Sequence, residues 1–196
     1  MKTIGITGGT GAGKTSALRA LEKLGAYVID CDEVYGALLR DNADMGREMA
    51  ERFPEAISED GIDRRVLART VFADPAALEE LNAITHKYVA AEVANRLELL
   101  RAGGGRLAAV DAIALIESGL HELCDTVVGV TAPAERRLER IMARDGIDDA
   151  RARMRIGAQR TDTFFRRNCD HILVNDCAGA EEFEEKCAAF FGEMIH

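Results

Sequence analysis

Short apolar runs alternate with stretches of helical periodicity over much of the chain. Five of these runs have the length and composition of buried strands, so we expect strands at 4–6, 26–29, 107–111, 126–130 and 171–174. A strand that is followed by a helix and then by another strand runs parallel to its predecessor. The pattern therefore predicts an α/β fold, in which a five-stranded parallel sheet lies between helices in three layers.

The segment after the second strand has a different pattern, with helical periodicity and almost no strand signal. We expect helices at 33–39, 45–53, 64–71 and 75–99. His86 marks a point where the last helix could break, and Asp74 followed by Pro75 is a typical helix start. We interpret residues 32–103 as a helical insertion that binds a second substrate. The predicted core is then 1–31, 104–143 and 165–196, with 144–164 as a lid.

The first strand leads into a glycine-rich loop and then a helical pattern. Residues 8–15 read GGTGAGKT, which fits the P-loop motif G-x-x-x-x-G-K-[ST] in its expected strand–loop–helix setting. Backbone N–H groups and the helix N-terminus bind phosphate there. A plain glycine-rich turn would not require Lys and Thr at this offset. The predicted contacts with a nucleoside triphosphate are Gly9, Thr10, Gly11, Ala12, Gly13, Lys14, Thr15 and Ser16.

The motif assigns individual roles around the phosphates. Lys14 reaches the β- and γ-phosphate oxygens, and the Thr15 hydroxyl holds Mg²⁺. The third strand ends in Asp111, as in a Walker B strand, whose carboxylate lies near the magnesium ion. Asp also ends many strands as a turn former. With a P-loop upstream we favour Asp111 as a metal ligand beside Thr15, with Glu117 a few residues further along.

Arginines concentrate in the last third of the chain. Ten of the 25 lysines and arginines lie between 136 and 167, and Arg136, Arg140 and Arg144 form one stripe on an expected helix at 134–144. A second helix is expected from Asp148 to about residue 160, and a last one at 180–194. Most of these arginines fit a solvated face with i,i+4 partners. The alternative is that a few of them close over the triphosphate as a lid.

Charge and composition limit the partners and the compartment. The net charge of −9 argues against nucleic acid as the main partner. The five cysteines form no CxxC pair, which is typical of thiols in a reducing cytoplasm. No apolar run approaches the length of a membrane span, and the N-terminus has no cleavable signal pattern. We therefore expect a cytoplasmic protein with no membrane partner.

The rest of the sequence indicates what happens to the γ-phosphate. The guanine-reading N-K-x-D motif is missing, and a small P-loop protein with a helical insertion and an arginine-rich segment has the layout of a small-molecule kinase. Such an enzyme needs a carboxylate near the acceptor hydroxyl. Asp32, after the second strand, can serve as that carboxylate and can also cap the next helix; the two roles are not exclusive, and we favour the first over capping alone.

An ordered set of motifs over nearly the whole chain resembles the dephospho-coenzyme A kinase family. The set comprises the P-loop with its strand; VIDCD at 28–32, which looks like V-I-D-A-D; Asp63-Arg64; VFADP at 71–75; LNAITH at 81–86; IESGL at 116–120, which resembles F-E-S-G-L; 140–146; 155–159; and Val174-Asn175.

This resemblance implies ATP-dependent phosphorylation of the ribose 3′-hydroxyl of dephospho-CoA, giving CoA and ADP. It implies that Asp32 is the base and that Arg144, with Arg140 as a second candidate, stabilises the transferring phosphoryl group. The insertion would hold dephospho-CoA, and Asn175 would lie near the adenine of ATP. The candidate acceptor contacts besides Asp32 are Arg64, His86 and Glu117. We expect a monomer.

The sequence departs from the family pattern at three places, one of which, Thr15-Ser16 in place of Ser-Thr after the P-loop lysine, keeps the chemistry. The chain also has DAIALIE at 111–117 where the family usually has D-[IV]-P-L-L-F-E, and Lys87 follows His86 where the family has proline. The change at 111–117 affects the predicted acceptor pocket and leaves the phosphate machinery intact. Two alternatives stay open: a P-loop kinase for another small acceptor, such as a nucleoside monophosphate or a sugar, and a nucleotide-binding module without phosphotransfer.

Overall fold

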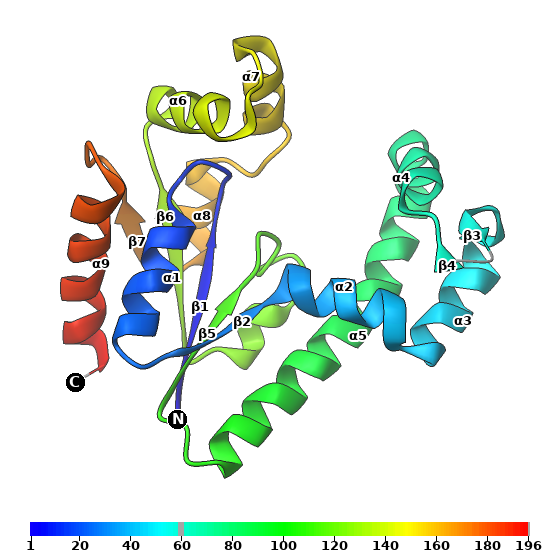
Figure 1. Cartoon of the computed structure of the whole chain (residues 1–196), viewed down its shortest axis with the longest axis horizontal. Coiled ribbons are helices and arrows are strands. Elements are labelled where there is room, and N and C mark those ends of the chain that lie inside the picture. The colour runs from blue at the N-terminus through cyan, green and yellow to red at the C-terminus, as the bar shows by residue number, and fades with distance from the viewer. Residues whose placement is uncertain (59–60, 196) are drawn as a thin grey trace. The chain divides into compact units, whose positions relative to one another are not determined.

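The computed structural model describes residues 1–58 and 61–195. The chain divides into two compact units (Figure 1). Met1–Ile29 and Leu100–His196 form the first, here called the core unit, and Asp30–Leu99 form the second, here called the helical unit.

The core unit is organised around a five-stranded sheet with the order β2-β5-β1-β6-β7. The strands are β1 (Lys2–Gly8), β2 (Tyr27–Asp30), β5 (Leu107–Asp111), β6 (Thr126–Thr131) and β7 (His171–Val174). β1 is central, and its Ile6 pairs in parallel register with Asp111 on one side and Val128 on the other. The predicted α/β fold with a five-stranded parallel sheet is confirmed. Because the strands are parallel, the loops that follow β1, β5 and β6 emerge at one edge.

Helices α1 (Lys14–Lys23) and α9 (Ala180–Ile195) cover one face of this sheet (Figure 1). Alternate residues of the central strands, such as Ile4, Ile6 and Val128, point to that face and pack with Phe183 and Phe191 of α9. The aromatic stripe that the sequence predicts for the last helix is therefore core. α1 presents Ala17, Ala20 and Leu21 to the same cluster, which fixes the helix that follows the P-loop.

The arginine-rich segment forms three short helices. They are α6 (Ala134–Asp145), α7 (Asp149–Gly157) and α8 (Asp162–Asn168). Asp148 caps α7 by accepting from Arg151 N (2.8 Å), as expected, but the helix ends at Gly157 rather than near residue 160. α8 was not predicted; its Phe165 packs at Gly129 of β6. α6 and α7 share a small core of their own, formed by Leu138, Ile141 and Ala152.

The helical unit contains α2 (Cys31–Asp41), α3 (Ala43–Arg52), α4 (Arg64–Ala73) and most of α5 (Pro75–Ala102). A separate core, which includes Met45, Met49 and Phe53, holds it together. α5 is continuous, so the break considered at His86 does not occur. A short antiparallel hairpin of β3 (Ile57–Ser58) and β4 (Gly61–Ile62) lies between the expected helices at 45–53 and 64–71, where the sequence has almost no strand signal.

Asp63 caps α4 by accepting from Arg65 N (2.8 Å) and Val66 N (3.1 Å), which lowers the pKa of the Asp63 carboxyl. Within the described residues, no helix is long and apolar enough to cross a membrane.

Candidate functional site

The P-loop, residues 8–15, joins β1 to α1 as the motif predicts. Gly13 occupies the position before the helix with φ 111°, in the left-handed region that side chains disfavour. A Cβ atom on Gly13 would also overlap Nδ2 of Asn175. Ala12 N donates to Gly9 O (3.1 Å) and Ser16 N to Gly13 O (3.0 Å), so the turn is closed on both sides of this glycine. Both the backbone angle and the close neighbour therefore require glycine there.

Three successive carbonyl groups of the P-loop are bound by side chains from distant segments. The bonds run from Arg137 Nε to Thr10 O (2.9 Å), from Arg140 Nη1 to Gly11 O (3.3 Å) and from Asn175 Nδ2 to Ala12 O (2.9 Å). In a trans peptide the N–H points away from the C=O. Holding the carbonyls of Thr10 and Ala12 therefore turns the N–H groups of Gly11 and Gly13 to the other side of the loop, whereas the N–H of Ala12 donates to Gly9 O. On that other side of the loop, the N–H groups of Gly11 and Gly13 are available to bind an anion.

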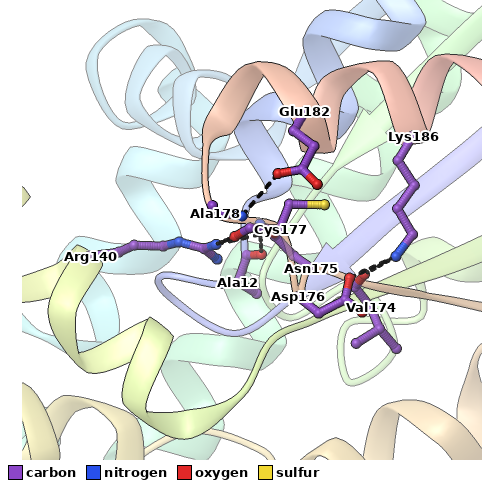
Figure 2. Close-up of polar contacts among 9 residues, drawn as sticks. All are labelled: Ala12, Arg140, Val174, Asn175, Asp176, Cys177, Ala178, Glu182 and Lys186. Atoms are coloured by element: carbon purple, nitrogen blue, oxygen red, sulfur yellow. Dashed lines mark hydrogen bonds and ion pairs between the residues drawn. The ribbon is translucent and has the colours of Figure 1, made fainter.

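Arg140 and Asn175 together tie the P-loop to the segment after β7 (Figure 2). Arg140 Nη2 donates to Asn175 Oδ1 (3.1 Å) and to Cys177 O (3.2 Å). Asn175 is 3% exposed and uses both ends of its amide, since its oxygen accepts from Arg140 while its nitrogen donates to Ala12. The structure thus places both residues against the loop backbone. Their predicted roles toward the phosphoryl group and the adenine stay predictions.

The segment after β7 is itself held by α9. Lys186 Nζ donates to Val174 O (2.9 Å) and to Asp176 Oδ1 (2.8 Å), and Glu182 Oε2 accepts from Ala178 N (3.0 Å) (Figure 2). The hydrogen bond from Lys186 lowers the pKa of the Asp176 carboxyl. The backbone on both sides of Asn175 is therefore held in place by α9, which restricts the position of the Asn175 side chain at the P-loop.

Lys14 and Asp111 come together at the carboxyl edge of the sheet. Lys14 Nζ lies 3.5 Å from Asp111 Oδ1, and the side chains are 17% and 16% exposed. Thr15 is exposed next to Lys14 in the first turn of α1. The chain thus offers a hydroxyl and a carboxylate oxygen, the donors that Mg²⁺ prefers.

Among the described residues, no cluster of three or more His, Cys, Asp or Glu could hold a metal ion. Magnesium in kinases is bound mainly by phosphates and water, with one or two protein oxygens. The donor set of Thr15 and Asp111 fits that kind of site.

A pocket of about 350 Å³ lies beside the P-loop. Gly9, Glu117, Gln159 and Arg160 contribute to its lining. Arg160 Nε donates to Glu117 Oε1 at 2.9 Å, so both charges of the pocket are paired. Glu117 was predicted near Asp111 or as an acceptor contact, and its ion pair with Arg160 was not anticipated. The pocket can accommodate a polar group adjacent to bound phosphates.

Arg144 lies at the exposed end of α6. Its guanidinium donates to both oxygens of Asp145 (2.7 and 3.0 Å), and Arg155 Nη1 donates to the same carboxylate (2.5 Å). The bond from Arg144 lowers the pKa of Asp145, which keeps this carboxylate ionised between the two arginines. Asp145 therefore links α6 to α7 through Arg155, and Arg144 is paired with the same carboxylate. The predicted action of Arg144 on the phosphoryl group would require it to leave Asp145.

Sequence analysis missed two residues at the P-loop, Arg137 and Gln159. Arg137 is 6% exposed, and this burial lowers its pKa. Gln159 contacts the loop through Thr10. The available signal was the place of Arg137 on the apolar stripe of α6, next to Leu138 and four residues before Ile141. An arginine in that stripe has to be buried with polar partners.

The helical unit carries the remaining predicted residues. Asp30, not Asp32, caps α2: its Oδ1 accepts from Asp32 N (2.8 Å) and Glu33 N (3.2 Å). The interpretation of Asp32 as the cap is wrong because the helix begins at Cys31, which makes Asp32 its second residue. The Asp32 side chain is exposed, so its carboxylate is not used by the helix start.

Arg64 and His86 lie on different helices of this unit. Arg64 is the first residue of α4, and its Nη2 lies 3.7 Å from where a Cβ on Gly36 of α2 would be. Burial raises the pKa of neighbouring Tyr35, and the charge of Arg64 opposes that shift. His86 is half-buried on α5. The predicted contacts of Arg64 and His86 with an acceptor stay predictions.

The chain matches the family model described as dephospho-CoA kinase over residues 2–181. It is 35% identical over 195 residues to a dephospho-CoA kinase of Corynebacterium jeikeium, covering 99% of this chain and 100% of the relative. The chain belongs to the dephospho-CoA kinase family. A relative from Moorella thermoacetica with the same name is 39% identical over 176 residues, covering 88% and 83%.

A dephospho-CoA kinase is a phosphotransferase that uses a nucleotide and an alcohol acceptor, so the predicted enzyme class is confirmed. The crystal structure of TT1252 from Thermus thermophilus matches with a TM-score of 0.79 and 33% identity, covering 98% of this chain and 97% of that one. The resemblance inferred from the ordered motifs is therefore confirmed over nearly the whole chain. The family that matches is a kinase family, which does not support the alternative of a nucleotide-binding module without phosphotransfer.

Proposed function

We propose that this chain carries out the reaction of its family, transfer of the γ-phosphoryl group of Mg-ATP to the ribose 3′-hydroxyl of dephospho-CoA. The products are CoA and ADP, and the reaction is the last step of CoA biosynthesis. The observation that carries the proposal is the P-loop with its outward carbonyls held by Arg137, Arg140 and Asn175. Donors fixed in advance of binding stabilise phosphoryl transfer without reorganisation.

On the donor side, Lys14 and the loop N–H groups neutralise the phosphates. Lys14 is held by Asp111 at 3.5 Å, and we propose that it exchanges this carboxylate for a phosphate oxygen when the triphosphate binds. That exchange leaves Asp111 and the Thr15 hydroxyl as the protein ligands of Mg²⁺. When bound, the ion supplies charge neutralisation at the phosphates.

On the acceptor side, Asp32 receives the proton of the 3′-hydroxyl. The capping of α2 by Asp30 supports this role, because it leaves the Asp32 carboxylate uncommitted to the helix. Residues 32–103 hold dephospho-CoA, with Arg64, His86 and Glu117 as contacts. Residues 144–164 act as the lid, Arg144 and Arg140 stabilise the transferring group, and Asn175 lies near the adenine.

We infer a monomer in the cytoplasm, with neither nucleic acid nor a membrane as partner. The net charge of −9 supports the first of these exclusions, because polyanions repel such a surface.

The test is ADP release from Mg-ATP across a panel of acceptors: dephospho-CoA, AMP, CMP, shikimate and gluconate. We expect strong stimulation by dephospho-CoA alone, with a product that has the mass of CoA. Stimulation by another compound, with none by dephospho-CoA, would overturn the proposal. It would show that the altered 111–117 segment has changed the acceptor.

A further inference from the structure

Arg137, Gln159 and Thr10 form a closed ring of hydrogen bonds behind the P-loop. Arg137 Nε donates to Thr10 O (2.9 Å) and its Nη2 to Gln159 Oε1 (2.7 Å). Gln159 Oε1 also accepts from Thr10 N (2.9 Å), while Gln159 Nε2 donates to Thr10 Oγ1 (2.6 Å). Thr10 is thus bound through its N–H, its carbonyl and its hydroxyl.

The orientation of the Gln159 amide is determined by its partners. Its oxygen faces two donors, the guanidinium of Arg137 and the N–H of Thr10. A flipped amide would bring its NH₂ group against both of these donors. Replacing Gln159 by an apolar residue would therefore leave three polar groups around it without this partner.

The charge of Arg137 is placed close to the loop. Arg137 is 6% exposed, and within the described residues the hydrogen bonds of its guanidinium go to two neutral oxygens. Asp162 raises its pKa through space, but burial outweighs that effect. Thr10 O belongs to the same peptide unit as the N–H of Gly11, so a cation on this carbonyl polarises that N–H into a better donor.

We propose that Arg137 and Gln159 are positioning residues that act through Thr10 to set the P-loop for polyphosphate. They do not need to touch the nucleotide: the ring fixes the Thr10 peptide, and the buried cation strengthens the Gly11 donor. The proposal rests on the proposed function in one respect, that the P-loop holds the phosphates of the donor. It adds two residues from α6 and from the segment after α7 to the determinants of donor affinity.

A purely structural role for Arg137 makes a different prediction. As a packing residue of α6, its loss would lower the stability of the fold and leave the affinity for phosphates unchanged. The readout must therefore be phosphate affinity, measured beside stability. Inorganic tripolyphosphate with Mg²⁺ is the appropriate probe, because it binds without an adenine and without an acceptor.

The first comparison is R137Q against R136Q, titrated with magnesium tripolyphosphate by calorimetry, with the thermal midpoint recorded for each. R136Q is the matched control, because Arg136 is the adjacent arginine on α6 and its ion pair with Glu139 is exposed. We expect R137Q to bind the probe roughly tenfold more weakly, since it loses hydrogen bonds from a charged donor. R136Q should stay within about twofold, as exposed pairs contribute little.

Gln159 gives the second comparison. Q159M should lower the affinity for the probe by a similar factor. The double variant R137Q/Q159M should bind the probe no less tightly than the single variant with the lower affinity, because both residues act on one peptide. R137K should lie between wild type and R137Q, since lysine keeps the charge but cannot make both bonds. In turnover assays the KM for ATP should rise while the KM for dephospho-CoA stays unchanged.

Equal affinities of R137Q and R136Q for the probe would overturn the proposal, as would additive effects of R137Q and Q159M. If R137Q does not fold, Q159M and T10V carry the test; T10V removes only the hydroxyl acceptor of Gln159. Wild-type affinity in both would overturn the proposal equally. Failure of dephospho-CoA as an acceptor would count against the proposed function alone, since the probe requires no acceptor.

Discussion

The P-loop and the helical unit use their polar side chains in opposite ways. Around the P-loop, Arg137 and Asn175 are nearly buried and bind backbone atoms, so each fixes one conformation. In the helical unit, charged residues pair with one another at the surface: Arg52 with Glu80, and Lys87 with Glu48 at 2.5 Å. Buried polar contacts to backbone fix a geometry, whereas exposed pairs exchange readily with solvent.

This difference between the P-loop and the helical unit corresponds to a difference between the two substrates. A phosphate chain is the same in every nucleotide, so a rigid set of donors suits it. The acceptor contacts proposed for the helical unit lie on helices whose charged groups have other surface partners. The following predictions test this contrast, starting with the largest effect.

D32N should reduce turnover about 10²–10⁴-fold, the usual contribution of a general base. ATP affinity, measured by calorimetry, should be unchanged, because Asp32 is assigned to the acceptor side. D30N is the matched control: Asn caps a helix about as well as Asp, so α2 and turnover should be preserved. Normal turnover in D32N would remove Asp32 from the mechanism.

G13A should destabilise the core unit by about 2–5 kcal/mol and abolish tight ATP binding, because it combines left-handed backbone strain with overlap at Asn175. G25A isolates the first cause. Gly25 also has a positive φ (88°), but no atom lies within 4 Å of its Cβ position. Its cost should be about 1–2 kcal/mol. Urea unfolding of both variants measures the difference, and equal losses would mean that Asn175 does not restrict the loop.

The core unit should lose stability in mild alkali. Burial raises the pKa of Cys124 and of Cys187 to about 12, and that of Cys169 to about 11. These thiols keep their protons in the folded state, while the unfolded chain releases them above its ordinary thiol pKa. Stability should therefore fall from pH 7.5 to 9.5 by about 1 kcal/mol per thiol. Urea unfolding at the two pH values tests this, and C187A should reduce the fall.

E80Q should change the free energy of unfolding by no more than about 1 kcal/mol, because the Arg52–Glu80 pair is exposed. Its side chains are 43% and 49% exposed. Denaturant unfolding at low and high salt gives the measurement. A larger loss, or one that salt does not reduce, would show that the helical unit depends on its surface pairs, and the contrast with the P-loop would fail.

The parts of the molecule that depend on local sequence could be predicted. The five strands follow from apolar runs, and the P-loop from the spacing of Gly13, Lys14 and Thr15. α8 could not, since it has seven residues and buries only Phe165. Asp30 and Asp32 could not be separated, because the choice depends on the residue at which α2 begins.

The side chains that bind the P-loop backbone could not be identified from sequence patterns, for another reason. Thr10 is 127 positions from Arg137 and 149 from Gln159. The apolar stripe of α6 indicates that Arg137 is buried, but no periodicity relates residues at such separations, so the pattern does not identify its partners. Its partners appear only once the fold brings α6 to the loop.

The same separations determine when the P-loop can take its final form during synthesis. The loop leaves the ribosome well before its last anchor, Asn175, which follows Ala12 by 163 positions. β1 must also wait for β5 and β6, its neighbours in the sheet. Contacts between such distant residues form late and after costly loop closure. The nascent chain therefore carries the complete motif long before it acquires the ability to bind phosphate tightly, because Asn175 must first be synthesised and reach Ala12.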